Sequence, residues 1–119
     1  MPESGRDQGV DTLNSAAWVL NHIGASLDTN INVNIGGAGV APIWSEDLGY
    51  DEARAALSEV FDRAAVTLVD LTDDDVDRVI TTVPGRPGMP SPTVGVMLAG
   101  VVGHTYAHAS ELHTIVVAA

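Results

Sequence analysis

The residues of this chain that could do chemistry are histidines near its C-terminal end. His104 and His108 stand four positions apart, and on a helix two such side chains project about 40° from each other, one turn above the other. Imidazoles in this arrangement can bind one metal ion together. Glu111 falls within about 20° of His104 on the same helical wheel, whereas His113 lies about 180° away. We therefore expect His104, His108 and Glu111 to share one face and His113 to lie at the surface.

A third histidine, His22, stands on an apolar side of an earlier helical segment. Trp18 lies one turn before it, and the small residues Ala25 and Ser26 follow one turn later, which leaves space beside the imidazole. The polar residues of this segment form a separate narrow seam: Asn14, Asn21, Asp28 and Asn32. Three imidazoles on apolar faces would each cost free energy if left unpaired. A shared divalent metal ion would satisfy them, and hydrogen-bonded core histidines without metal are the other interpretation.

Helical periodicity accounts for most of the chain. It predicts a short helix over about 73–80 and three long helices, over about 11–35, 51–71 and 93–117. The expected N-terminal caps of these helices are Asp11–Thr12, Thr72 and Thr93. Glycines end the first helix, prolines make residues 82–92 a loop, and no stretch alternates as a strand does. The predicted fold class is all-α, an antiparallel helical bundle of three long helices plus one short helix.

The apolar surface of these helices is larger than three helices can cover among themselves. The only formal charge in 93–117 is Glu111, so the last helix is expected to be central, and Trp18 and Tyr106 are expected in the core. Gly100 in the same helix costs about 1 kcal/mol of helix propensity relative to alanine, which indicates a packing or pocket role. We expect the remaining apolar surface to complete the bundle by homodimerisation.

Composition restricts the class of protein. The 119 residues make one domain, which we place at 11–119 after a frayed tail at 1–10. Without cysteine there is no disulfide, no cysteine-ligated metal and no cysteine nucleophile. A net charge of −11 opposes nucleic acid and anionic membranes, and no segment resembles a membrane span or a secretory signal. We therefore expect a cytoplasmic protein with neither nucleic acid nor membrane as a partner.

Several of these features together resemble the DinB-like family of metal-dependent four-helix-bundle proteins. The similarity rests on the segment Asn14–Ile23, the loop with Gly36–Gly37, the amphipathic second helix, the proline-rich loop and His104-x-x-x-His108. It extends over almost the whole chain. The order and spacing of these features carry more weight than any single residue.

The resemblance implies a metal site and a reaction. The site would hold zinc or nickel through His22, His104 and His108, with water or substrate in its open positions. Characterised relatives are S-transferases that use mycothiol or bacillithiol, and mycothiol-dependent isomerases, in which the metal ion activates the thiol toward a small electrophile. The isomerase-type relatives carry a glutamate in place of the first histidine of the closing pair, so His104 favours the DinB-like branch.

Two departures from the family leave alternatives open. Family members begin with another long helix before the segment that contains His22, where this chain has about ten polar residues, so we expect a partner chain to complete the bundle. No general acid or base accompanies the histidines, and Glu111 either orients His108 through a hydrogen bond or is an exposed helix carboxylate. The alternatives to a thiol-dependent S-transferase are a non-catalytic homodimer with a structural or vestigial metal site, and a metal-free dimer with three core histidines.

Overall fold

The computed structural model describes residues 15–37 and 41–118, and over these residues the chain is helical without any strand. Its elements in chain order are α1 (Ala16–Leu27), the π-helix η1 (Asp28–Ile35), α2 (Tyr50–Val69), the 3-10 turn η2 (Asp73–Asp75) and α3 (Val94–Ala118). The all-α prediction is confirmed. The predicted tail at 1–10 and the predicted cap at Asp11–Thr12 lie outside the described residues.

The first predicted helix is present from residue 16 to 35, as α1 followed directly by η1. Ser15 is its described N-cap, because its side chain accepts a hydrogen bond from Trp18 N at 3.0 Å. The wider turns of η1 end at a hydrogen bond from Gly36 N to Ile31 O of 2.9 Å, five residues back. Gly37 follows with φ of 108°, a left-handed backbone that favours glycine and ends the helix.

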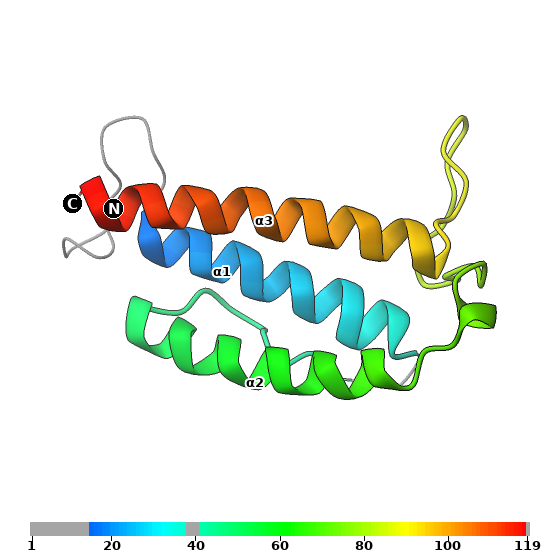
Figure 1. The fold of residues 1–119 in the computed structure, drawn as a ribbon, viewed down its shortest axis with the longest axis horizontal. Coiled ribbons are helices and arrows are strands. Elements are labelled where there is room, and N and C mark those ends of the chain that lie inside the picture. The colour runs from blue at the N-terminus through cyan, green and yellow to red at the C-terminus, as the bar shows by residue number, and fades with distance from the viewer. Residues whose placement is uncertain (1–14, 38–40, 119) are drawn as a thin grey trace.

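α1 is the central helix, and α2 and α3 lie on opposite sides of it (Figure 1). The core is made by residues of α1 and η1 with the inner faces of the two flanking helices, including Val19, Leu20, Ile23, Val60, Val101 and Ile115. α3 runs antiparallel to α1, whereas α2 runs parallel to it (Figure 1). The parallel direction arises because residues 41–49 return along α1 before α2 begins, so that Trp44 contacts Asp28 and Leu48 contacts Asn21.

The polar seam of α1 and η1 is buried, and it anchors this returning segment. Asn21 accepts hydrogen bonds from Leu48 N at 2.7 Å and from the Trp44 indole Nε1 at 3.0 Å. Asp28 is 0% exposed and accepts from Trp44 N at 2.8 Å and from Asn32 Nδ2 at 3.0 Å. Asn14 of the seam lies outside the described residues. Backbone and indole N–H groups therefore take the place of water as hydrogen-bond donors to the seam, as buried polar groups require.

The expectation that the last helix is central is wrong. Only one face of α3 packs against α1, and its other face is exposed, with Val102 at 67% and Tyr106 at 75%. The prediction of Tyr106 and Trp18 as core residues is also wrong. Tyr106 lies on the exposed face of α3, and Trp18 of α1 is 45% exposed. No further helix of the described chain covers these surfaces. The apolar composition of the last helix therefore did not mean that this helix is buried on all sides.

The segment between α2 and α3 contains less helix than predicted. Thr72 and Asp75 form the expected capping box, but the helix stops at Asp75 and does not reach Ile80. Instead Ile80 N donates to Pro92 O at 2.8 Å, which closes the predicted proline-rich loop at its base. Thr93 caps α3 as predicted, because its side chain accepts from Val96 N at 3.2 Å. Among the described helices, none is both long and apolar enough to cross a membrane.

Candidate metal centre

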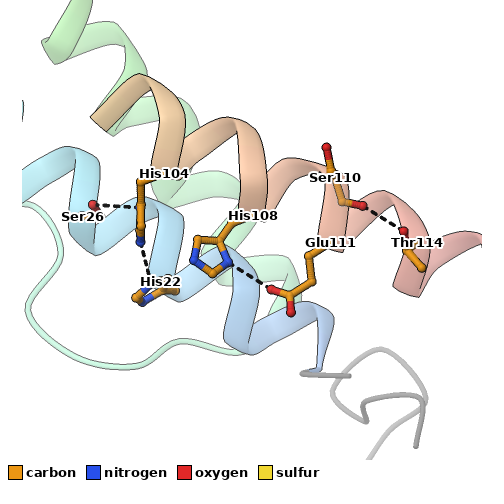
Figure 2. Close-up of polar contacts among 7 residues, drawn as sticks. All are labelled: His22, Ser26, His104, His108, Ser110, Glu111 and Thr114. Atoms are coloured by element: carbon orange, nitrogen blue, oxygen red, sulfur yellow. Dashed lines mark hydrogen bonds and ion pairs between the residues drawn. The ribbon is translucent and has the colours of Figure 1, made fainter. Parts of the chain in front are cut away.

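Three histidines from two helices meet between α1 and α3 (Figure 2). His22 comes from α1, and His104 and His108 come from successive turns of α3. The Nε2 atoms of His22 and His104 are 2.9 Å apart, and the ring centroids of the three pairs are separated by 4.4 to 4.7 Å. One ligand nitrogen from each ring lies within 4.8 Å of the others. The three residues predicted as ligands therefore converge on one small volume.

The cluster follows from the local folding of α3. Its inner face carries Val101, one turn before His104, and Ile115, both buried against α1. These apolar anchors fix the rotation of α3, so that the two imidazoles between them must point at α1. His113 is exposed and faces away from the cluster, as predicted.

Glu111 orients His108. Its Oε1 atom lies 3.0 Å from His108 Nδ1, and both side chains are about three-quarters shielded, with exposures of 23% and 22%. A proton held on Nδ1 by this carboxylate leaves the Nε2 lone pair free for a metal ion. Glu111 therefore makes the hydrogen bond to His108 that one of its two interpretations requires, and its role at a metal site stays a prediction.

His104 has a weaker partner on its outer side. Ser26 Oγ lies 3.4 Å from His104 Nδ1, and Asn30 Nδ2 donates to Ser26 Oγ at 3.3 Å. The Ser26 hydroxyl occupies the Nδ1 side of the ring, so that Nε2 is the atom that faces His22. Ser26 was predicted only as a small neighbour of His22, and its contact with His104 was not predicted. Its spacing of four from both His22 and Asn30 was the available signal.

Burial lowers the pKa of His22 below its ordinary value, the charge of His108 lowers that pKa further, and Glu111 opposes the shift. Burial likewise lowers the pKa of His104, assisted by His108 and His22. Desolvation disfavours the imidazolium, and so do neighbouring imidazolium charges. Both rings are therefore neutral at physiological pH, with lone pairs available to a cation.

Trp18 forms one wall of the cluster. Its indole stacks on the His22 ring with a centroid distance of 4.7 Å and an interplanar angle of 16°. It also meets His108 edge-on at 6.0 Å. Because Trp18 is partly exposed, it separates the histidines from solvent without closing the site. Trp18 was predicted in the core, although its position four residues before His22 on the same helix indicates a contact with that ring.

A cleft of about 330 Å³ adjoins His104 on the side of Ser26. It is lined by Ser26, Asn30, Met97, Gly100, Val101 and His104. A Cβ atom at Gly100 would meet nothing within 4 Å, so the absent side chain is what leaves this space open. Of the packing and pocket roles predicted for Gly100, the structure agrees with the second, since Gly100 lines the cleft. The lining is uncharged, and its volume is at the lower end of the range of small-molecule sites.

The donor set is suited to a divalent metal ion of intermediate softness. Three imidazoles would supply three ligands, and imidazole favours zinc, nickel and copper over magnesium or calcium. Three protein ligands leave coordination positions open, as in catalytic zinc sites, whereas structural zinc sites have four. The histidine cluster can therefore hold a metal ion that still binds a further molecule.

The chain was compared with known proteins. The family model of the DinB superfamily matches residues 2–112. No curated protein and no solved structure matches the chain. The matched range includes all three histidines of the cluster, and it extends over far more than half of the 119 residues. The chain belongs to the DinB superfamily.

Proposed function

We propose that this protein binds zinc or nickel through the Nε2 atoms of His22, His104 and His108 and transfers a low-molecular-weight thiol to a small electrophile. The observation that carries the proposal is the convergence of three imidazoles, two of which have an outer partner that directs Nε2 inward. Such oriented ligands are typical of functional metal sites. Membership of the DinB superfamily supports the same site.

A bound divalent ion would lower the pKa of a thiol that occupies its open position. In the reaction the thiol releases its proton to solvent water, its sulfur forms a bond to an electrophilic carbon, and a leaving group such as chloride departs with the electron pair of the broken carbon–chlorine bond. The chain has no cysteine, so the nucleophile must come from a soluble thiol. The resemblance to S-transferases points to mycothiol or bacillithiol.

The residues around the cluster would shield it from water and bind the electrophile. Trp18 shields one side of the histidines, which limits access of water. The cleft beside His104 offers the Ser26 hydroxyl, the Asn30 amide and apolar side chains to an uncharged electrophile. We place the protein in the cytoplasm, where low-molecular-weight thiols are kept reduced. The net charge of −11 gives no attraction to nucleic acid.

The first test is metal content by elemental mass spectrometry on untagged protein. We expect about one zinc or nickel per chain, none in a His22→Ala, His104→Ala double variant, and the parental amount in His113→Ala. His113 is the matched control because it lies on α3 outside the cluster. No metal in the parent, even after incubation with zinc and nickel, would leave three core histidines and overturn the proposal.

The second test is turnover. Loss of free thiol with a chlorinated nitroarene should require metal and should disappear in His104→Ala, while His113→Ala retains it. Full metal occupancy with no thiol loss for mycothiol or bacillithiol would instead identify a non-catalytic metal-binding bundle. The two assays together separate metal binding from catalysis.

A further inference from the structure

The outer face of α3 is apolar and has no partner in the described chain. Seven exposed residues on this face alternate at spacings of three and four, and we call them the outer seam: Val96, Ala99, Gly103, Tyr106, Ser110, His113 and Val117. Val102, Ala109 and Val116 flank the seam and are also exposed. This spacing is the heptad pattern with which helices pack in pairs. The seam faces away from His104 and His108, so its role is independent of the metal.

The charge of the protein is distributed unequally between its two sides. The only charged residue of α3 is Glu111, which bonds to His108 on the inner face. Exposed acidic residues gather on α2 and on the segments before and after it: Glu46, Asp47, Asp51, Glu52, Glu59, Asp62, Asp70, Asp73, Asp74 and Asp77. α2 lies across α1 from α3 (Figure 1). Among the described residues, the side of α2 is therefore acidic and the outer face of α3 carries no carboxylate.

We propose that the outer seam of α3 binds the same seam of a second copy. Two chains of charge −11 repel each other, and the α3 face is the surface on which they can meet without opposing carboxylates. A seam-to-seam contact also places the acidic α2 of each copy on the outside, where the two negative surfaces are farthest apart (Figure 1). A lipid surface is a poorer match, because the face offers no lysine or arginine to anionic headgroups.

The side chains of the seam fit a symmetric pair. Tyr106 is the largest of them and is 75% exposed, and it stands between the small residues Gly103 and Ser110. A Cβ at Gly103 would meet nothing within 4 Å, so this position is an open depression in the surface. When two seams align antiparallel about a two-fold axis that passes between Tyr106 and Ser110, each Tyr106 meets the small residue Ser110 of the other copy. An isologous interface requires such self-complementarity.

The test is the mass in solution, measured by light scattering during gel filtration. The parent should have about twice the chain mass of 12.3 kDa. Tyr106→Glu places a charge in the seam and should raise the dimer dissociation constant at least about 100-fold, giving a monomer at micromolar concentration. Val66→Glu on α2, also at an exposed valine, should leave the mass unchanged. A monomeric parent, or a Tyr106→Glu variant that remains dimeric, would overturn the proposal.

A cross-linking measurement keeps the test decisive if Tyr106→Glu fails to fold. The chain has no cysteine, so a thiol-specific cross-linker can join only the introduced cysteines of two copies. Ser110→Cys lies in the seam and should be captured as a covalent dimer by a short bismaleimide. Ser58→Cys, at an exposed serine of α2, is the matched control and should remain monomeric. Equal cross-linking of the two variants would contradict pairing through α3.

Discussion

At the scale of single residues, the contact between Glu111 and His108 shows how one side chain prepares another. The carboxylate lies 3.0 Å from Nδ1 of the imidazole and leaves Nε2 toward the other two histidines. Such outer partners commonly account for one to two orders of magnitude in metal affinity. Glu111 is thus expected to matter for metal binding although it cannot reach the ion while it holds His108.

Replacement of Glu111 should weaken metal binding without abolishing it. Glu111→Ala releases the His108 ring and removes a negative charge near the ion, so we expect zinc affinity to fall by about 10- to 100-fold. The measurement is competition with a chelating dye. Glu59→Ala, at an exposed carboxylate on α2, is the control and should bind zinc like the parent. Equal affinities of the two variants would show that Glu111 does not support the site.

The pKa values of the histidines predict how the metal-free protein responds to acid. Because the pKa of His22 and that of His104 are lowered in the folded state, the unfolded chain takes up protons first as the pH falls below the ordinary value of 6.5. Stability is therefore retained above about pH 6.5 and declines as the pH falls from there toward the folded pKa values. Asp75, whose pKa is lowered from 3.8, affects stability only at lower pH.

The measurement is the urea midpoint in the presence of chelator at about pH 7.5 and about pH 5.5. The parent should lose stability between these values. A His22→Ala, His104→Ala double variant should lose markedly less, while His113→Ala should behave like the parent. The same loss in parent and double variant would assign the pH dependence to other groups.

The three candidate ligands lie together in the structure, and for His104 and His108 this was predictable, because a spacing of four on an apolar helix constrains direction strongly. The contacts of Ser26 and the stacking of Trp18 were not predicted, although both residues stand four positions from His22. Those contacts depend on which side of α1 faces α3. Periodicity predicts an apolar face and not the identity of the helix that covers it.

At the scale of elements, the buried seam of α1 and η1 decides the topology. The residues whose spacing predicted a polar stripe accept hydrogen bonds from the segment 41–49. Asp28 accepts from the backbone of Trp44, and Asn21 accepts from the Trp44 indole and the backbone of Leu48. This segment returns along α1 and makes α2 parallel to it. The sequence could not distinguish a solvated stripe from a buried one, since both have the same helical period.

Asp28 is expected to be the most sensitive position of this seam. Asp28→Ala leaves Trp44 N and Asn32 Nδ2 without their acceptor in the core, and we expect a loss of about 3 kcal/mol in the free energy of unfolding. The control is Asp62→Ala on the exposed side of α2, which should stay within about 0.5 kcal/mol of the parent. Urea unfolding followed by circular dichroism measures both. A loss below about 1 kcal/mol for Asp28→Ala would contradict the anchoring role.

Gly100 allows the cleft to be separated from the metal ligands. Gly100→Leu adds a side chain where a Cβ meets no neighbour, so it should fill the cleft, leave zinc content unchanged and reduce thiol transfer at least about 10-fold if the electrophile binds there. The control is Gly49→Leu, at an equally open glycine that does not line the cleft. Undiminished transfer in Gly100→Leu would place the electrophile elsewhere.

At the scale of the whole molecule, the excess of apolar surface was predictable, but its location was not. Composition indicated more apolar area than three helices can cover, and α3 was expected at the centre because it is nearly uncharged. The structure places α1 at the centre, since only α1 contributes both a buried polar seam and apolar faces toward two neighbours. A helix can thus lack charged residues because it packs against a second chain, even when it does not lie at the centre of its own.

The unequal charge distribution predicts a salt dependence for the proposed dimer. Raising sodium chloride from about 50 mM to about 500 mM screens the repulsion between the acidic sides and leaves an uncharged interface unaffected, so association should tighten. The measurement is the dimer dissociation constant from sedimentation at both concentrations. An interface held by ion pairs would weaken instead, and that result would contradict pairing through the outer seam.

The two tryptophans occupy different environments, and this gives the protein two separate optical signals. Trp44 is 8% exposed with its indole nitrogen bonded to Asn21, so its fluorescence should be shifted to shorter wavelength and resist iodide. Trp18 is half-exposed and lies against His22, so its emission should be quenched by iodide and by a paramagnetic ion such as nickel. Arrival of a metal at the histidines can therefore be followed in unlabelled protein, with Trp44 as the internal reference.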